Sequence, residues 1–184
     1  MKTYQTSEIK NIVLVGGAGS GKTTLAEALA YEGKVIDRRG SIENDNTLSD
    51  NSDLEHIYKR SIYPTLLYTE FMNRKLNIID APVSDDFCGG VFSASKGADV
   101  AVMVFNAQTG FDVGSEIQSR YAMATKKPLI GAVNQLDHDK ANWEQTIESI
   151  QSQSRVKPVL VQYPVSVGAT FDSFIDLLLM KMYR

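Results

Sequence analysis

Short apolar runs alternate with amphipathic segments along most of the chain. The runs have the length and composition of buried strands, and they lie at 12–16, 76–80, 101–106, 129–134 and 159–163. The segments with helical periodicity lie at 22–31, 112–125, 142–152 and 172–182. This alternation predicts an α/β fold in which a mostly parallel sheet carries helices on both faces. Asn142 and Gln145 have the spacing of a partial capping box, which predicts where the third helix begins.

Two segments depart from this alternation. Residues 65–72, the polar Asn73-Arg74-Lys75 and the run 76–79 predict a hairpin, which adds one antiparallel strand to the sheet. Residues 37–60 are rich in Asn, Asp and Ser and have no sustained period. A long irregular stretch of this kind is typical of a functional lid or a disordered segment.

The composition is that of an ordinary globular domain. The 184 residues are 43% hydrophobic and 22% charged, which suits one α/β domain with a substantial core. A formal net charge of -3 gives no global basic field, so a contact with nucleic acid or ribonucleoprotein must be local or carried by other domains. We expect a monomer without direct DNA binding.

Cysteine content and hydropathy predict a cytoplasmic protein. Cys88 is the single cysteine and cannot form an internal disulfide, and no basic and apolar leader precedes the first strand. The longest apolar runs, 98–105 and 175–180, are too short or too interrupted to span a bilayer. We therefore expect no membrane segment.

A glycine-rich motif follows the first apolar run directly. Residues 16–23 fit the pattern G-x-x-x-x-G-K-[ST], which binds polyphosphates: backbone N–H groups surround the phosphates, Lys22 reaches the β and γ groups, and the Thr23 hydroxyl can ligate Mg²⁺. The strand before it and the helix formers after it put the phosphates at a helix N-terminus, which favours this interpretation over a purely structural turn. The predicted fold is thus a three-layer P-loop NTPase sandwich. The predicted phosphate contacts are Gly16, Gly17, Ala18, Gly19, Ser20, Gly21, Lys22, Thr23 and Thr24.

Two further strands end in candidate ligands. The run 76–80 ends in Asp80, which in P-loop proteins lies beside the metal and acts on Mg²⁺, here through water; by itself, a strand that ends in Asp is also typical of a turn. Asn134-Gln135-Leu136-Asp137 follows another buried strand, where ligands bind in open α/β sheets.

The last of these motifs can read a base. A carboxylate at Asp137 accepts paired hydrogen bonds from the N1–H and exocyclic amine of guanine, which adenine cannot supply. Asn134 either ties this loop to the phosphate loop or touches guanine N7. A turn that opens a helix with Asn and Asp is the structural alternative.

Together these motifs resemble the guanine-nucleotide domain of translational GTPases, most closely elongation factor G, over nearly the whole chain. The resemblance rests on the phosphate loop, Asn77-Ile78-Ile79-Asp80-Ala81-Pro82 with Asp86-Phe87, Val102-Met103-Val104, and Val133 to Asp137. It implies binding of GTP or GDP with Mg²⁺, and the ribosome as partner of the intact factor.

The C-terminal part of the chain resembles the start of the insert in the elongation factor G GTPase domain. Val161-Gln162-Tyr163-Pro164-Val165 and the stretch 175–181 carry this resemblance. We therefore expect a GTP-binding domain at 1–157 and, at 158–184, either the start of that insert or a terminal strand and helix of the same domain. The first alternative makes the chain an N-terminal fragment; in the second, Ser166-Val167-Gly168 stands in for the family's Ser-Ala guanine loop.

Four positions depart from the family pattern. Tyr63 stands where the family has the Mg²⁺-binding Thr of the first switch, Val83 replaces a Gly near the γ-phosphate, and Ser84 replaces the His expected to orient the attacking water. Lys22 and Ser84 are the candidate catalytic residues, and with Ser84 defective we expect weak or lost hydrolysis. Asp85 or Asp86 is a less favoured substitute for water placement. Gln135 replaces a Lys, which predicts weaker affinity with guanine preference retained.

Three functional interpretations follow. The first is a GTP-binding domain of an elongation factor G-like translocation factor, the second a non-cycling regulatory or ribosome-protection module, and the third an unrelated P-loop ATPase or small-molecule kinase. His56, His138 and Cys88 lack partners at metal-ligand or catalytic spacing, and we expect them to be structural or solvated.

Overall fold

The computed structural model describes residues 2–49, 52–58, 61–82 and 88–184. A five-stranded sheet has the order β2-β3-β1-β4-β5 and contains β1 (Ile9–Val15), β2 (Thr65–Phe71), β3 (Arg74–Asp80), β4 (Val100–Asn106) and β5 (Leu129–Asn134). Strands β1, β3, β4 and β5 are parallel, and β2 is antiparallel to β3. The predicted α/β fold, mostly parallel with one antiparallel strand, is confirmed.

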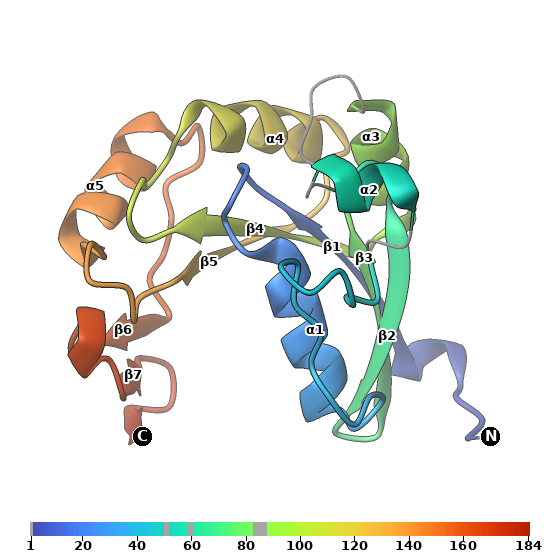
Figure 1. Cartoon of the computed structure of the whole chain (residues 1–184). Helices are drawn as coiled ribbons and strands as arrows, with labels where there is room; N and C mark the ends of the chain where they lie inside the picture. The colour runs from blue at the N-terminus through green and yellow to red at the C-terminus, as the bar shows by residue number, and fades with distance from the viewer. Residues whose placement is uncertain (1, 50–51, 59–60, 83–87) are drawn as a thin grey trace.

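Helices cover both faces of this sheet (Figure 1). Helix α1 (Lys22–Glu32) lies on one face, while α3 (Cys88–Gly97), α4 (Val113–Ala124) and α5 (Trp143–Gln153) lie on the other. The short helix α2 (Asp53–Tyr58) lies in the segment between α1 and β2. The three-layer arrangement that the alternating pattern predicts is therefore present.

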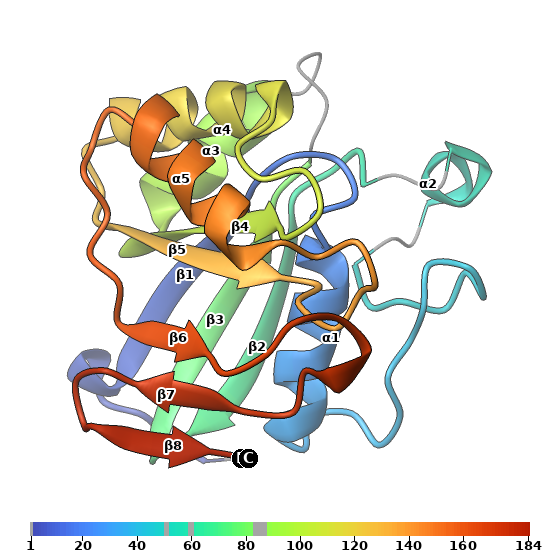
Figure 2. The same ribbon diagram turned by 90° about the vertical axis from the view of Figure 1, so that its left-hand side faces the viewer.

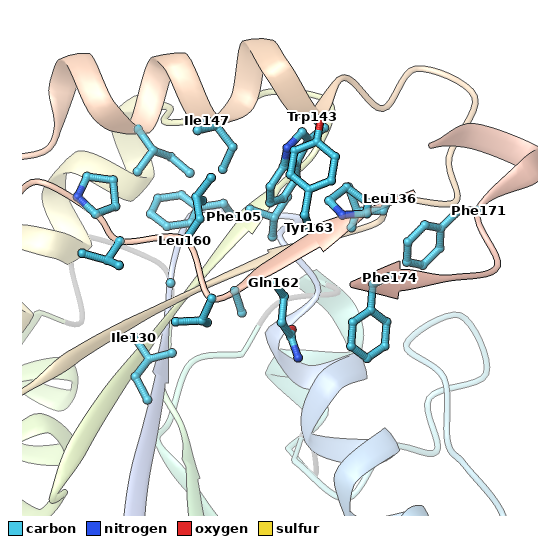
Figure 3. Close-up of a pocket in the computed structure, with 18 residues that line it drawn as sticks. Phe105, Ile130, Leu136, Trp143, Ile147, Leu160, Gln162, Tyr163, Phe171 and Phe174 are labelled. Atoms are coloured by element: carbon cyan, nitrogen blue, oxygen red, sulfur yellow. The ribbon is translucent and has the colours of Figure 1, made fainter. Parts of the chain in front are cut away.

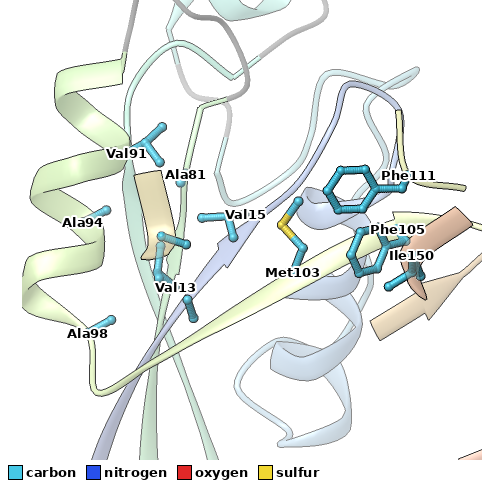
Figure 4. Packing of buried hydrophobic residues seen from close by; sticks show 12 residues of the cluster. Val13, Val15, Ala81, Val91, Ala94, Ala98, Met103, Phe105, Phe111 and Ile150 are labelled. Carbon is cyan, nitrogen blue, oxygen red and sulfur yellow. The ribbon is translucent and has the colours of Figure 1, made fainter. Parts of the chain in front are cut away.

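Each face has its own apolar cluster because successive strand residues point to opposite sides. Leu14 and Ile78 pack with Ala26 of α1, and Val13 and Val15 pack on the opposite face. Figure 4 shows the second cluster, in which three side chains of α3 approach β1: Val91, Ala94 and Ala98. This packing holds β1 rigidly, and the phosphate loop starts where β1 ends.

The predicted starts of α4 and α5 agree with the structure. Asn142 Oδ1 accepts a hydrogen bond from Gln145 N at 3.0 Å and caps α5. Asp112 caps α4 in the same way, through Ser115 N at 2.7 Å. The predicted hairpin is also confirmed: Met72 and Asn73 have φ values of 46° and 59°, as a tight two-residue turn requires.

The prediction of a helix at 172–182 is wrong. Strands β6 (Gln162–Pro164), β7 (Phe174–Asp176) and β8 (Lys181–Tyr183) form a separate antiparallel sheet (Figure 2). The turn between β7 and β8 is fixed by Asp176 Oδ1, which accepts hydrogen bonds from Leu178 N and Leu179 N at 2.9 and 2.8 Å. A side chain that bonds to the backbone two and three residues later competes with the helix.

The prediction of a strand of the main sheet at 159–163 is also wrong. Only its end belongs to a strand, β6, and that strand pairs with β7. Between β5, α5 and 158–164 lies an apolar pocket of about 500 Å³, lined by Ile130, Trp143 and Tyr163 among others (Figure 3). Pro158 and Pro164 have no N–H to donate, so this segment is a poor partner for β5.

Candidate nucleotide site

Four parallel strands bring the predicted site residues to one edge of the sheet. The loop of residues 16–21 follows β1, Asp80 ends β3, and Asn134 ends β5. Asn106, which ends β4, joins them. Ligands of open α/β sheets bind at this carboxyl edge, where the strand ends meet.

Gly21 forms the junction between the phosphate loop and α1. It is the N-cap residue of α1 and has a φ of 88°, a conformation that residues with a Cβ seldom adopt. A Cβ on Gly21 would lie 2.3 Å from Asn134 Nδ2, so the loop and β5 approach each other closely here. Among the other predicted contacts, Gly16, Gly17 and Ser20 are buried, whereas Ala18, Gly19 and Thr24 are exposed.

Lys22 points back into the loop from the first turn of α1. Its ammonium donates to Gly16 O and Gly17 O, each at 3.0 Å, and the residue is only 5% exposed. Burial lowers the pKa of Lys22 from 10.5 to about 8, although the charges of Asp80 and Asp112 oppose the shift. A phosphate would compensate this buried cation in the same way.

Thr23 and Asp80 form the predicted metal pair. Thr23 Oγ1 donates to Asp80 Oδ2 at 2.7 Å, and both residues are buried. A third oxygen that the sequence did not predict, Ser61 Oγ, lies 3.3 Å from Thr23 Oγ1. These are hard oxygen donors of the kind that Mg²⁺ takes, so the residues present fit this ion. Among the described residues there is no group of three or more His, Cys, Asp or Glu that could hold a metal.

Amide side chains tie the loop after β5 to the phosphate loop. Asn134 Nδ2 donates to Ser20 O and Gln135 Nε2 donates to Gly19 O, both at 2.9 Å. Asn106 Nδ2 also donates to Gly19 O, at 3.2 Å. The structure thus shows the first of the two contacts expected for Asn134, and Asn106 is a site residue that the sequence reasoning missed.

Asp137 lies exposed three residues after Asn134, at the same edge of the sheet. Two residues before Asp137, Gln135 has a φ of 61°. Its Oε1 accepts a hydrogen bond from Gln108 Nε2 at 2.8 Å. Gly168 N donates to Leu136 O at 2.7 Å, so the segment that contains Ser166-Val167-Gly168 contacts this loop.

Asp112 is a second group that the sequence reasoning missed. A Cβ on Gly17 would lie 2.7 and 2.8 Å from the two carboxylate oxygens of Asp112, so the start of α4 is in close contact with the phosphate loop. A Cβ on Gly114 would likewise lie 3.1 Å from Gly17 Cα. The signal in the sequence was the spacing of Asp112 and Ser115, which predicts a cap but gives no information on its neighbour.

Two buried carboxylates hold the irregular segment between α1 and β2. Glu27 of α1 is 1% exposed and accepts hydrogen bonds from Gly40 N at 2.9 Å and from Leu48 N. Glu55 of α2 accepts from Ile62 N and Tyr63 N at 2.9 and 3.2 Å. Burial acts to raise the pKa of Glu55, but these backbone donors and Ser52 outweigh it and lower the pKa below its usual range. Where it is described, this segment is attached to α1 through Gly40 and Leu48 and contains one short helix, α2.

The remaining candidate residues are not tested by the described site. Val83, Ser84, Asp85 and Asp86 lie outside the described residues, as does the side chain of Cys88. His138 Nδ1 accepts from Lys140 N at 3.2 Å within its own turn. No helix in the described part of the chain is long and apolar enough to cross a membrane.

Comparison with known proteins agrees with this geometry. The family model "Elongation factor Tu GTP binding domain" matches residues 7–181. An "Elongation factor G-like protein" of Mycobacterium tuberculosis is 30% identical over 96% of this chain, and one of Synechocystis sp. is 27% identical over all of it. The crystal structure of a Thermus thermophilus protein, ttk003000868, superimposes with a TM-score of 0.89 at 30% identity and covers 97% of the chain.

The chain spans only part of these proteins. It covers 28% of the Synechocystis relative, 24% of the mycobacterial one and 27% of the Thermus chain.

Proposed function

Because the chain belongs to the family of elongation factor Tu-type GTP-binding domains, we propose that it binds GTP and GDP together with Mg²⁺. Its site would hold the phosphates at 16–24 and read guanine with Asp137. The intact factor is an elongation factor G-like protein that acts on the ribosome in translocation, in the cytoplasm. Relatives named elongation factor G and elongation factor G-like protein support this assignment.

The observation that carries the proposal is the link between the two halves of the site. Asn134 bonds to Ser20 O and Gln135 bonds to Gly19 O, so the loop that would read the base is attached to the loop that would hold the phosphates. A purine nucleotide that spans both loops would contact groups already held at a fixed spacing. An unrelated P-loop ATPase or kinase would not require Asp137 at the end of this arrangement.

Competition between nucleotides tests the choice of base. Labelled GDP bound to the purified chain should be displaced by GTP and not by a large excess of ATP. Asp137→Asn should lose at least a factor of ten in this preference because the paired acceptor is gone. Asp139→Asn, an exposed neighbour in the same turn, is the matched control and should behave as wild type. Strong displacement by ATP in the wild type would overturn the guanine assignment.

Mg²⁺ would be held by Thr23, with Asp80 acting on it through water. When bound, this ion would supply positive charge that offsets the charge of the phosphates. Thr23 presents a hydroxyl that is already oriented by its bond to Asp80. Lys22 supplies a second positive charge, and its ammonium is held by Gly16 O and Gly17 O until a phosphate replaces them.

Hydrolysis is expected to be slow. Ser84 has no imidazole with which to orient water, and a loss of this kind lowers phosphoryl-transfer rates by about 10²-fold or more. Single-turnover phosphate release by the full-length factor with ribosomes measures the step. Rapid release would refute this part of the proposal, and Ser84→His should accelerate a slow wild-type reaction.

The presence of Ser84 in place of the family's His also favours the non-cycling alternative. If the factor only occupies or protects ribosomes, the nucleotide sets conformation and turnover is dispensable. Retention on ribosomes should then differ between GTP and GDP while no phosphate is released. Retention that is independent of nucleotide would exclude both forms of the proposal.

We also propose that residues 158–184 begin an insert of the elongation factor G type. The support is that β6, β7 and β8 form a sheet of their own rather than extending the main one.

A further inference from the structure

We propose that Ser61 supplies the oxygen of the first switch to the nucleotide-bound Mg²⁺, in place of the residue at position 63. This inference rests on the proposed binding of Mg²⁺ and nucleotide. It changes the expectation drawn from the sequence, in which Tyr63 stands at the position of the family's Mg²⁺-binding Thr.

The first support is the spacing of the oxygens. In octahedral Mg²⁺ sites with bonds of about 2.1 Å, neighbouring ligand oxygens lie about 3.0 Å apart. Ser61 Oγ lies 3.3 Å from Thr23 Oγ1. Thr23 Oγ1 has one proton and donates it to Asp80 Oδ2, so Ser61 is the donor in its contact with Thr23. Both hydroxyls therefore have lone pairs to offer to a cation that enters beside them.

The second support is the way in which Ser61 is held. Glu55 accepts hydrogen bonds from the two backbone N–H groups that follow Ser61, those of Ile62 and Tyr63. Glu55 is 3% exposed, and Ser52 N and Oγ also donate to it, at 3.1 and 2.9 Å. A buried carboxylate with several donors fixes the backbone at 62 and 63, and with it the position of Ser61. Glu55 is thus a positioning residue for the proposed ligand.

The third support is the exposure of Tyr63. The residue is 57% exposed, whereas its backbone N–H donates to Glu55. Tyr63 is therefore largely solvent-exposed, whereas Thr23 and Asp80 are buried. A serine hydroxyl is also closer in size and chemistry to the Ser or Thr hydroxyls that ligate Mg²⁺ in P-loop proteins.

The dependence of nucleotide release on Mg²⁺ tests the proposal without any hydrolysis. Dissociation of a fluorescent, non-hydrolysable GTP analogue from the purified chain is followed at increasing Mg²⁺ concentrations. Ser61→Ala should raise the Mg²⁺ concentration that gives half-maximal slowing by about tenfold. Ser61→Thr, which keeps the hydroxyl, should stay within about twofold of wild type, and Tyr63→Phe is the matched control with no expected shift. Glu55→Gln should shift the midpoint in the same direction as Ser61→Ala.

The outcomes separate the two proposals. An unchanged midpoint for Ser61→Ala, or an equal shift for Tyr63→Phe, would overturn the role of Ser61 while nucleotide binding stands. With excess EDTA, wild type and Ser61→Ala should release the analogue at the same rate, and a difference there would also overturn it. If the wild type binds no guanine nucleotide at any Mg²⁺ concentration, the proposed function itself fails, and this inference fails with it.

Discussion

Replacing Gly21 with alanine tests two constraints that act on one position of the phosphate loop. A positive φ such as the 88° of Gly21 costs a residue with a Cβ about 1–2 kcal/mol. The new Cβ would also lie 2.3 Å from Asn134 Nδ2, the end of a side chain that can rotate away. Rotation breaks the 2.9 Å hydrogen bond to Ser20 O, a loss of about 1 kcal/mol. We expect Gly21→Ala to lower the free energy of unfolding by about 2–3 kcal/mol.

Gly19 provides the matched control for this substitution. It has a φ of 69°, but a Cβ there would meet nothing within 4 Å. Gly19→Ala therefore carries the strain alone, and the two variants should differ by about 1 kcal/mol in urea unfolding followed by circular dichroism. In the presence of Asn134→Ala this difference should vanish, which gives a coupling energy of about 1 kcal/mol in the double-mutant cycle. Equal losses for Gly21→Ala and Gly19→Ala with no coupling would refute the reasoning.

Three further predictions concern buried or crowded charges. Glu27→Ala should lower the free energy of unfolding by about 3 kcal/mol and make residues 37–49 sensitive to protease, since two backbone N–H groups lose a charged acceptor; the exposed Glu32→Ala on the same helix should change neither. Folding lowers the pKa of Lys22 to about 8, so between pH 8 and 10.5 the unfolded chain holds more protons than the folded one. The free energy of unfolding of the wild type should therefore rise with pH in this range relative to that of Lys22→Met. A difference between the two proteins that does not change with pH would contradict this. Asp112→Asn keeps the helix cap and removes a negative charge beside Gly17, so GTP and GDP should bind several-fold more tightly at low salt, with a smaller gain at high salt; calorimetry showing no gain at either ionic strength would contradict the electrostatic role.

The sequence predicts those parts of the fold that depend on residues close together along the chain. The β2–β3 hairpin follows from a polar turn between apolar runs, and α5 follows from the cap at Asn142. Helix α3 was not predicted because Gly89 and Gly90 give its first turn low helix propensity. Its formation is explained by tertiary packing of Val91 and its neighbours on β1, which only the folded sheet supplies.

The errors at the C-terminal end have a different cause. The run of Leu177, Leu178 and Leu179 favours a helix by propensity, yet the turn through Asp176 and the pairing of β7 with β6 give two strands. Strand pairing between 162–164 and 174–176 is a contact between distant residues, which helix propensity and periodicity do not report.

The site residues also fall into those that local motifs predict and those that only the folded structure brings to the site. Motif spacing predicted the phosphate loop, Asp80 and Asn134 as residues at strand ends, and the structure places them at one edge of the sheet. Ser61 was not found because the family pattern places the ligand at position 63, and Asp112 was not found because its spacing to Ser115 predicts only a helix cap. Position in the sequence pointed to Tyr63, whereas the structure places the hydroxyl of Ser61 beside Thr23.

The amide links from Asn106, Asn134 and Gln135 to the phosphate loop have a consequence for how fast a ligand is captured. A glycine-rich loop without such hydrogen bonds samples many backbone conformations. A ligand could bind only the correct one and would have to immobilise it. Anchoring two of its carbonyls to rigid strand ends removes much of that search beforehand, so less entropy is lost when a ligand arrives. The same hydrogen bonds couple the phosphate loop to the neighbouring strand ends. A displacement of β5 would therefore weaken the contacts to the phosphates and to the base together.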